Sequence, residues 1–445
     1  MNHQQLFANT PPGKLFFLAA IPGAIGMLAS ALYQLVDGAF VGHILGAQAF
    51  AAINLVMPLV VINFSLADLI GVGSSVPIAI KLGEGDHKSA CTFFSSACLL
   101  IVLTSAVFGA ILYTLAPIFL RMMGAQGELA DLARQYMRVY AVCLPFTSLM
   151  FATDNYLRIC GKIRMSMWLN IVSSVASIVL EFLFLSVLKI GIRGAALGTC
   201  LGMFLCTVVS LMPFMAGKLQ LRFCAPSWNK RVLASIVKNG CPTFLNNVSG
   251  QITSILMNYV LLRIGGAQAV SVYGIMMYAN GFIQPLLYGL CDSLQPAVGF
   301  NWGAKNYGRV VAIEKWCFAA SAVLSILMTV AMLAVPEAVT GIFVKPEETE
   351  LFSLSVHAMS LFSFAYLVRW ISYAAQSYLS AVGKAGYATA ISVCTAFVFP
   401  VFLIVVLWPL KLNGLWLNFP VTALLAAAMS LILLIRFQKT IRLSQ

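Results

Sequence analysis

The chain repeats the stretch Ile44-Leu45-Gly46-Ala47-Gln48-Ala49 as Ile264-Gly265-Gly266-Ala267-Gln268-Ala269, 220 residues later. Pro22 returns as Pro242 at the same offset. A duplicated half in a strongly apolar chain is how many secondary transporters are built, with the substrate site where the repeats meet. The repeat therefore predicts two related halves. It also directs attention to the residues that the two halves do not share.

Composition places the chain in a membrane. Hydrophobic residues make up 61% of the 445 residues and charged residues only 9%, whereas soluble domains carry about 25% charged residues. A membrane-spanning helix needs roughly 20 apolar residues, and a spanning β-strand would be about half as long with alternating polarity. Twelve suitable helical runs fall near residues 15–41, 49–80, 91–117, 132–158, 164–188, 192–216, 232–262, 269–300, 313–335, 351–382, 386–410 and 414–437.

These runs predict an all-α integral membrane protein with twelve transmembrane helices in two pseudo-symmetric six-helix lobes. We place the N-lobe at residues 1–216, a cytoplasmic linker at 217–231 and the C-lobe at 232–445. With both termini in the cytoplasm, eighteen Lys and Arg residues lie on the cytoplasmic side and nine on or toward the other side, as the positive-inside rule expects. The net charge of +13 then reflects loops beside the lipid bilayer and requires no nucleic-acid partner.

Motifs for enzymatic chemistry are missing from the sequence. Gly83-Glu84-Gly85-Asp86 lacks the spacing of a phosphate-binding loop. The eleven cysteines show no C-x-x-C spacing and the four histidines no paired motif, so we expect packing cysteines, no metal cluster and no cofactor. A sensor or a membrane enzyme would need an added soluble domain, and the longest polar connector, Gly217 to Lys238, is too short for one. We therefore expect no enzyme, and a transporter without an ATPase must use an ion gradient.

Three acids lie inside the predicted helices of the first half. Asp37 lies in the first helix with Gln34 on the same face, Asp154 lies in the fourth, one turn from Arg158, and Glu181 lies in the fifth. An ionisable group inside a membrane is costly and is usually functional. Either the three acids form one pocket that binds a cation or holds a proton, or each is neutralised separately, as Arg158 would neutralise Asp154.

The second half has lost these acids. At the offset of 220, Asp37 corresponds to Met257 and Glu181 to Val401. A different acid, Asp292, lies near several aromatic residues. A carboxylate suits the ammonium group of a cationic solute and aromatic rings suit its flat faces, although ordinary packing also explains the rings. The predicted substrate chamber comprises Gln34, Tyr278, Gln284, Tyr288, Asp292, Trp370 and Tyr373.

Two further stretches carry a family resemblance. The first reads Gln295-Pro296-Ala297-Val298-Gly299-Phe300-Asn301-Trp302-Gly303-Ala304-Lys305-Asn306-Tyr307-Gly308-Arg309 and resembles the Q-P-x-x-G-[FY]-N-[YW]-G-A…R signature of the MATE (multidrug and toxic compound extrusion) family. The second reads Leu32-Tyr33-Gln34-Leu35-Val36-Asp37-Gly38-Ala39-Phe40-Val41-Gly42 and resembles the family's L-Y-x-x-V-D-x-x-F-V-G. The chain is most similar to the bacterial branch that contains DinF-like and MepA-like proteins.

The resemblance implies a transporter that opens alternately to either face of the bacterial plasma (inner) membrane, and we expect it to be a monomer. Such proteins export amphipathic, often cationic compounds in exchange for H⁺ or Na⁺. Cation entry would neutralise the Asp37–Glu181 pair and favour repacking around Pro22, where members of the family can bend, and substrate would then be released outward. Matched residue by residue, the family's cation site falls on Asp37, Asp154, Ser177, Glu181 and Thr199.

The sequence leaves three alternatives open. Na⁺ would use several oxygen ligands around Asp37 and Glu181, whereas H⁺ needs one carboxylate that holds it, and several close carboxylates slightly favour H⁺. The small amphipathic substrate is either a drug or a native metabolite. A flippase for lipid-linked saccharides, from the same superfamily, would need a cationic cavity, and Arg369 is an isolated basic residue in a mainly acidic membrane interior.

Overall fold

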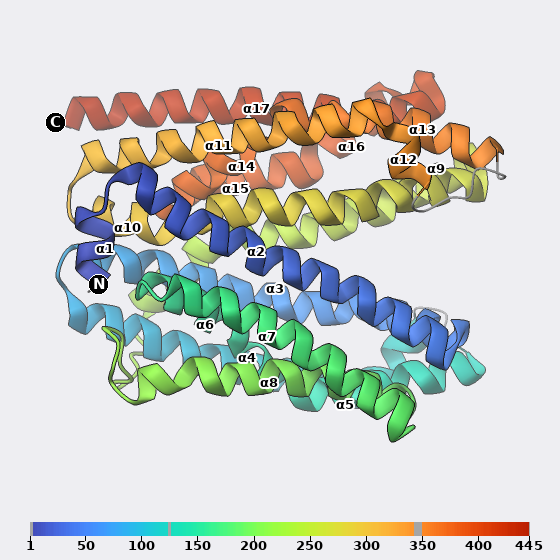
Figure 1. The fold of residues 1–445 in the computed structure, drawn as a ribbon, viewed down its shortest axis with the longest axis horizontal. Coiled ribbons are helices and arrows are strands. Elements are labelled where there is room, and N and C mark those ends of the chain that lie inside the picture. Colours follow the sequence, from blue (N-terminus) through green and yellow to red (C-terminus); the bar gives the residue numbers. More distant parts are fainter. Residues whose placement is uncertain (1–2, 123–125, 342–348, 445) are drawn as a thin grey trace.

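The computed structural model describes residues 3–122, 126–341 and 349–444, and within these ranges every regular element is a helix or a helical turn (Figure 1). Nine of the described helices are long and apolar enough to cross a membrane. A tenth span results from joining α13 (Thr349–Ser363) and α14 (Tyr366–Ala381), which are bent by 48°. The pair α5 (Gly127–Thr147) and α6 (Leu149–Ile159) forms one more span, and α9 (Lys230–Asp292) forms two spans because it is broken in the middle.

The first half of the chain contains six spans. The pair α5 and α6 is less apolar than the others because its first turns carry Glu128, Asp131, Arg134 and Arg138. The elements are α1 (His3–Asn9), α2 (Pro12–Phe40) with the π-helical turn Val41–Leu45, α3 (Ala47–Gly83), α4 (His87–Met122), α5 (Gly127–Thr147), α6 (Leu149–Ile159), α7 (Ile163–Phe182) with the π-helical turn Leu183–Val187, and α8 (Ile192–Met215).

The second half contains six more spans. Its longest element, α9, is broken at Gly266, whose backbone is not helical, and so it holds two of them. The elements are α9 (Lys230–Asp292), α10 (Gln295–Gly303), α11 (Tyr307–Ala334), α12 (Pro336–Gly341), α13, α14, α15 (Ala385–Val393), the π-helical turn Cys394–Val398, α16 (Phe399–Val406), the 3₁₀ turn Trp408–Leu410 and α17 (Lys411–Ser444).

The turns explain why the opening stretch is repeated. Gly46 and Gly266 have φ angles of 87° and 65°, a left-handed conformation that glycine adopts readily and other residues rarely do. Each glycine stands where one span ends and the next begins. Further residues with positive φ match at an offset of 220 or 222, and they are Gly85 with Lys305, Gly161 with Gly383, and Gly191 with Lys411.

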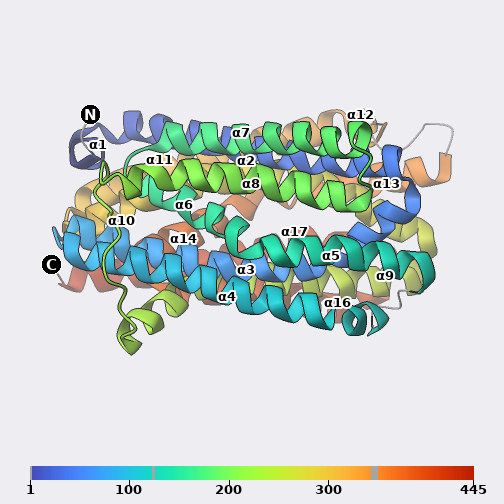
Figure 2. The ribbon, with the colours of Figure 1, turned by 90° about the horizontal axis from the view of Figure 1, so that it is seen from below.

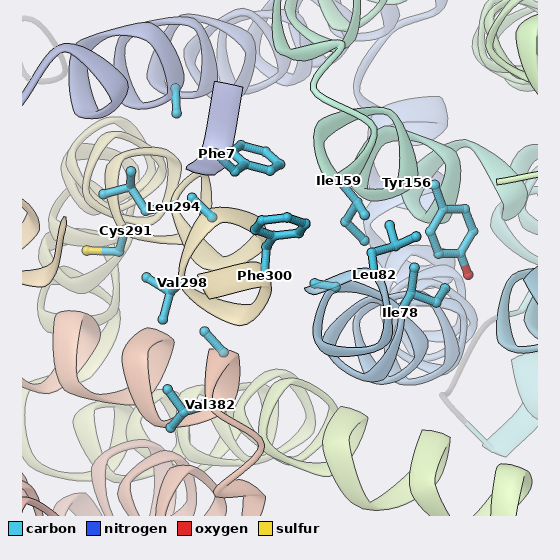
Figure 3. Packing of buried hydrophobic residues seen from close by; sticks show 14 of the residues in the cluster. Phe7, Ile78, Leu82, Tyr156, Ile159, Cys291, Leu294, Val298, Phe300 and Val382 are labelled. Carbon is cyan, nitrogen blue, oxygen red and sulfur yellow. The ribbon is translucent and has the colours of Figure 1, made fainter. Parts of the chain in front are cut away.

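The two halves share one apolar core at the end of the molecule that holds both termini (Figures 1 and 2). Figure 3 shows Leu82 of α3 beside Phe300 of α10, with Phe7 of α1 above that ring. Further from the termini the cores are separate. One buried cluster lies wholly in the first half, around Leu120, and another lies wholly in the second half, around Met332. The shared core therefore closes the molecule at the end with the termini.

Glycines bring the helix backbones of the two halves into contact at this closed end. A Cβ atom at Gly83 would lie 2.0 Å from the carbonyl oxygen of Phe300, and one at Gly303 would lie 2.1 Å from that of Ile80. Real Cβ atoms essentially never approach so closely, so α3 and α10 cross with no room for a side chain. Because Gly83 and Gly303 are equivalent in the repeat, the duplicated glycine forms one pseudo-symmetric contact.

Polar contacts also fasten the N-terminal segment to the second half. Asn301 donates from Nδ2 to the carbonyl oxygen of Phe7 at 3.1 Å, and Arg309 donates from Nε to the same oxygen at 2.8 Å. The Arg309 guanidinium also donates to the carbonyl oxygen of Thr10. Both side chains belong to the Gln295–Arg309 stretch, so part of that signature serves to hold the closed end together.

We expect Gly83→Ala and Gly303→Ala to destabilise the closed end, because the added methyl group must push α3 and α10 apart. Overpacking of this kind costs about 1–3 kcal/mol. Thermal unfolding of the purified protein in detergent measures the effect as a lower Tm for each variant. Gly308→Ala is the control, since a Cβ atom there meets nothing within 4 Å. A Tm equal to that of the unaltered protein in both test variants would contradict the close crossing.

Candidate functional site

A chain of polar groups crosses the first half between α2, α7 and α8. The hydroxyl groups of Tyr33 and Thr199 are hydrogen bonded at 2.7 Å, and Tyr33 donates to Asp37 Oδ1 at 3.5 Å. The Asp37 carboxyl group in turn interacts with that of Glu181. The structure therefore brings together three of the predicted cation-site residues, Asp37, Glu181 and Thr199. It adds Tyr33, which the sequence interpretation had not included among the site residues.

Glu181 is the least satisfied group of this cluster. Its side chain is 0% exposed, and neither carboxylate oxygen has a hydrogen-bond partner among the described residues. A buried, unpaired carboxylate is strongly unfavourable, and the nearby carboxylate of Asp37 adds repulsion. The Asp37–Glu181 pair is therefore unfavourable when both carboxylates are charged and nothing else is bound.

A ladder of glycines on α8 sets the position of Glu181 and Ser177 on α7. A Cβ atom at Gly198 would lie 2.7 Å from Glu181 Cα, and one at Gly202 would lie 2.2 Å from Ser177 Oγ. Gly194, one turn earlier, packs in the same way against Phe184. Small residues at every fourth position let membrane helices approach closely. Ser177 is buried and lies one turn from Glu181, as the sequence predicts.

Asp154 belongs to a different network, to which the structure does not bring Asp37 or Glu181. Its Oδ2 atom lies 2.6 Å from Arg158 Nη2, and Asn170 donates to its Oδ1 atom at 2.8 Å. Ser166 donates to Oδ1 as well, and it accepts a hydrogen bond from Arg158 Nε at 3.0 Å. Of the two interpretations left open for Asp154, this geometry matches pairing with Arg158.

The predicted substrate residues of the second half are only partly brought together. The rings of Tyr288 and Tyr373 stack with centroids 4.6 Å apart. Gln284 accepts a hydrogen bond from Asn280 at 2.6 Å. Trp370 lies apart from that stack, against Phe318 of α11. Gln34 and Tyr278, which were also predicted to line the substrate chamber, are exposed.

Asp292 lies at the boundary between the halves. Its Oδ1 atom accepts from Gln295 Nε2 at 2.7 Å, and the same nitrogen lies 3.1 Å from Ser377 Oγ. It also lines a small cavity together with Asn155 of α6. Asp68 of α3 interacts with Asp292 electrostatically from the other half. The sequence interpretation missed Asp68, although an acid inside the predicted span 49–80 was a sufficient signal.

Pro22, the predicted hinge, lies inside α2 where this helix crosses α9. The helix continues through it. The next residue, Gly23, packs so closely that a Cβ atom there would lie 2.8 Å from the carbonyl oxygen of Gly289. A proline lacks the backbone donor that would stabilise the helix at this point. The position thus combines a weakened helix with a tight contact between the halves.

Duplicated helical lobes with charged groups in their interior define the class, an integral membrane transporter. The chain belongs to the MATE family, because residues 22–183 and 242–406 match the family model MatE. Multidrug export protein MepA of Staphylococcus aureus (strain MSSA476) is 26% identical over 423 residues, which cover 91% of this chain and 90% of the relative.

Solved structures resemble the chain over its whole length. The crystal structure of MATE in complex with MaL6 superposes with a TM-score of 0.91 at 20% identity, covering 99% of this chain and 100% of the other. The outward-facing conformation of a multidrug resistance MATE family transporter of the MOP superfamily gives a TM-score of 0.88 at 21% identity, covering 97% of each chain. At this level of identity the similarity concerns the fold.

These findings confirm the family assignment made from the Gln295–Arg309 and Leu32–Gly42 stretches, including its MepA-like branch. They also confirm the all-α fold of twelve transmembrane helices in two six-helix lobes. The chain is thus a multi-pass membrane protein. The roles assigned to individual site residues stay predictions, and so does the cation that is exchanged.

Removing one partner of the Asp154–Arg158 pair should cost more than removing both. Arg158 is almost fully buried, at 4% side-chain exposure, and a buried pair that loses one partner is destabilised by about 3–5 kcal/mol. We therefore expect Arg158→Gln to lower the Tm strongly and Arg158→Gln/Asp154→Asn to recover much of the loss. Thermal unfolding in detergent measures both.

The exposed pair Asp131–Arg134, with its atoms 2.7 Å apart, provides the control for this comparison. Removing one of its partners should change stability by less than about 1 kcal/mol. Strictly additive losses for Asp154→Asn and Arg158→Gln would show that these two residues do not act as a pair.

Proposed function

We propose that this protein is a cation-coupled antiporter that exports amphipathic, cationic organic compounds in exchange for H⁺ or Na⁺. The observation that carries the proposal is Glu181, a fully buried carboxylate that lacks a hydrogen-bond partner among the described residues and lies beside Asp37. Such a pair is stable when a cation or a proton occupies it. The name of the staphylococcal relative, multidrug export protein, supports an exporter.

H⁺ is the coupling ion that this pocket favours. The other polar groups described around the pair are neutral hydroxyls. Those of Tyr33 and Thr199 already bond to each other, and those of Tyr136 and Tyr140 are buried near Asp37. Asp154, the third carboxylate considered for a Na⁺ site, is engaged by Arg158. One proton held by Asp37 and Glu181 removes their repulsion without further ligands, whereas Na⁺ would need several more oxygen atoms.

The closed end supports alternating access between two faces of the membrane. The loops next to the shared core carry basic residues, including Lys162, Lys305 and Lys384. By the positive-inside rule this end faces the cytoplasm, and both termini with it, in a bacterial plasma membrane. The arrangement then corresponds to a state closed toward the cytoplasm. Occupation of the Asp37–Glu181 pair would bias α2 to repack around Pro22.

Substrate recognition would use the second lobe and the boundary between the lobes. Asp292, with Asp68 opposite, offers negative charge to a cationic group. The stacked rings of Tyr288 and Tyr373 offer flat apolar faces one turn away. Cations and aromatic rings attract each other, so these groups suit a flat organic cation.

We expect Asp37→Asn and Glu181→Gln each to abolish efflux that is driven by an imposed gradient, because the pair can then no longer exchange its cation. The measurement is loss of a fluorescent lipophilic cation from proteoliposomes, with ΔpH and ΔNa⁺ imposed separately. Asp131→Asn is the matched control, since this exposed carboxylate lies on α5 away from the pair. Full gradient-driven efflux in both test variants would refute the proposal.

A further inference from the structure

Arg369 of α14 is a charged group inside the second lobe whose described partners are all neutral. Its Nη1 atom donates to Asn280 Oδ1 at 3.4 Å, a long hydrogen bond. Its guanidinium lies 5.9 Å from the ring centre of Tyr366 and 5.6 Å from that of Tyr373. The ion pairs of the described residues do not include it, and its electrostatic neighbours are tyrosines.

These neutral contacts leave most of the guanidinium unused. An arginine stays protonated and has five N–H donors in a planar fork that fits a carboxylate with two parallel hydrogen bonds. Inside a membrane, arginine usually pairs with an acid or with backbone carbonyl groups. Here Asn280 Oδ1 also receives a shorter hydrogen bond of 2.7 Å from the Tyr366 hydroxyl, and the other polar partner of the guanidinium is the neutral Tyr373 hydroxyl. The fork therefore has N–H donors left for an anionic ligand.

The position of Arg369 relative to the stacked tyrosines defines what else that ligand must contain. Arg369 precedes Tyr373 by one helical turn on α14, and Asp292 follows Tyr288 by one turn on α9. Gln295 Nε2 bonds both Asp292 and Ser377, so these two residues lie side by side. Ser377 follows Tyr373 by one turn on α14. Arg369 and Asp292 thus lie on opposite sides of the Tyr288–Tyr373 stack, about two turns or 11 Å apart.

We propose that Arg369 binds an oxyanion, such as a carboxylate, at one end of an aromatic substrate whose other end carries an ammonium group held by Asp292. The Tyr288–Tyr373 stack contacts the flat body between them. Arg369 and Tyr288 are both only half-buried, so a ligand can reach them. The proposal rests on the transport function proposed above and assigns Arg369 as the residue that recognises an acidic group on a substrate.

The test compares binding of two fluorescent probes to the purified protein without any ion gradient. One is 6-(piperazin-1-yl)-2-naphthoic acid, which carries an ammonium and a carboxylate at opposite ends. The other is its methyl ester, which keeps only the ammonium. Hydrogen bonds to charged groups contribute about 1.5–3 kcal/mol. Arg369→Gln should therefore raise the Kd of the acid, relative to the Kd of the ester, roughly tenfold or more.

A second variant keeps the test valid if Arg369→Gln does not fold. Asn280→Asp places a carboxylate against the intact guanidinium and should reduce binding of the acid probe in the same way, because it occupies the fork. Arg263→Gln is the control. It removes another guanidinium, which lies 5.3 Å from the ring centre of Tyr259 and is exposed, and it should leave the ratio unchanged.

An acid-to-ester ratio that is the same in the unaltered protein, Arg369→Gln and Asn280→Asp would overturn the proposed oxyanion site. If an ion gradient drives efflux of the ester but the binding ratio shows no preference for the acid, the oxyanion site is overturned and the antiport function is left intact. A ratio that shifts as expected without any gradient-driven efflux would support the site and refute the antiport function.

Discussion

Charges inside the membrane must be compensated, and this chain does so in different ways in its two lobes. Asp154 is compensated within the protein by Arg158. Asp37 and Glu181 instead face each other, and Arg369 in the other lobe has neutral partners. Uncompensated charge in a low-dielectric interior is costly. In the proposed function the Asp37–Glu181 pair of the first lobe would hold the exchanged cation, and Arg369 and Asp292 of the second lobe would hold the substrate.

The architecture was largely predictable because it follows from properties that act along the chain. Long apolar runs predicted the helices, and the breaks between them coincide with turns that need a positive φ angle, such as Gly46 and Gly266. The repeat of Gly83 as Gly303 reflects a contact between the lobes. The apolar runs also predicted one span over α5 and α6, in spite of the charged first turns of α5, and two separate spans within α9, which is broken at Gly266.

The candidate site was predictable only in part, because contacts between helices depend on how each helix is rotated against its neighbours. Spacing along the chain placed Ser177 on the same helix face as Glu181. It did not indicate that the glycines of α8 pack against both residues. The sequence left open whether Asp154 joins Asp37 or pairs with Arg158, and only the structure shows its network with Arg158. The contact between Asn280 and Arg369 joins two helices that are far apart in sequence, and no local pattern indicates it.

The central claim is that substrate and a cation move in opposite directions through one protein. The most direct measurement loads proteoliposomes with a lipophilic cation, imposes no ion gradient, and follows internal pH with a dye and Na⁺ uptake with a radioactive tracer. The account predicts that the outward substrate gradient drives H⁺ into the vesicles, and that Glu181→Gln abolishes this flow. Substrate efflux with no accompanying movement of H⁺ or Na⁺ would contradict it.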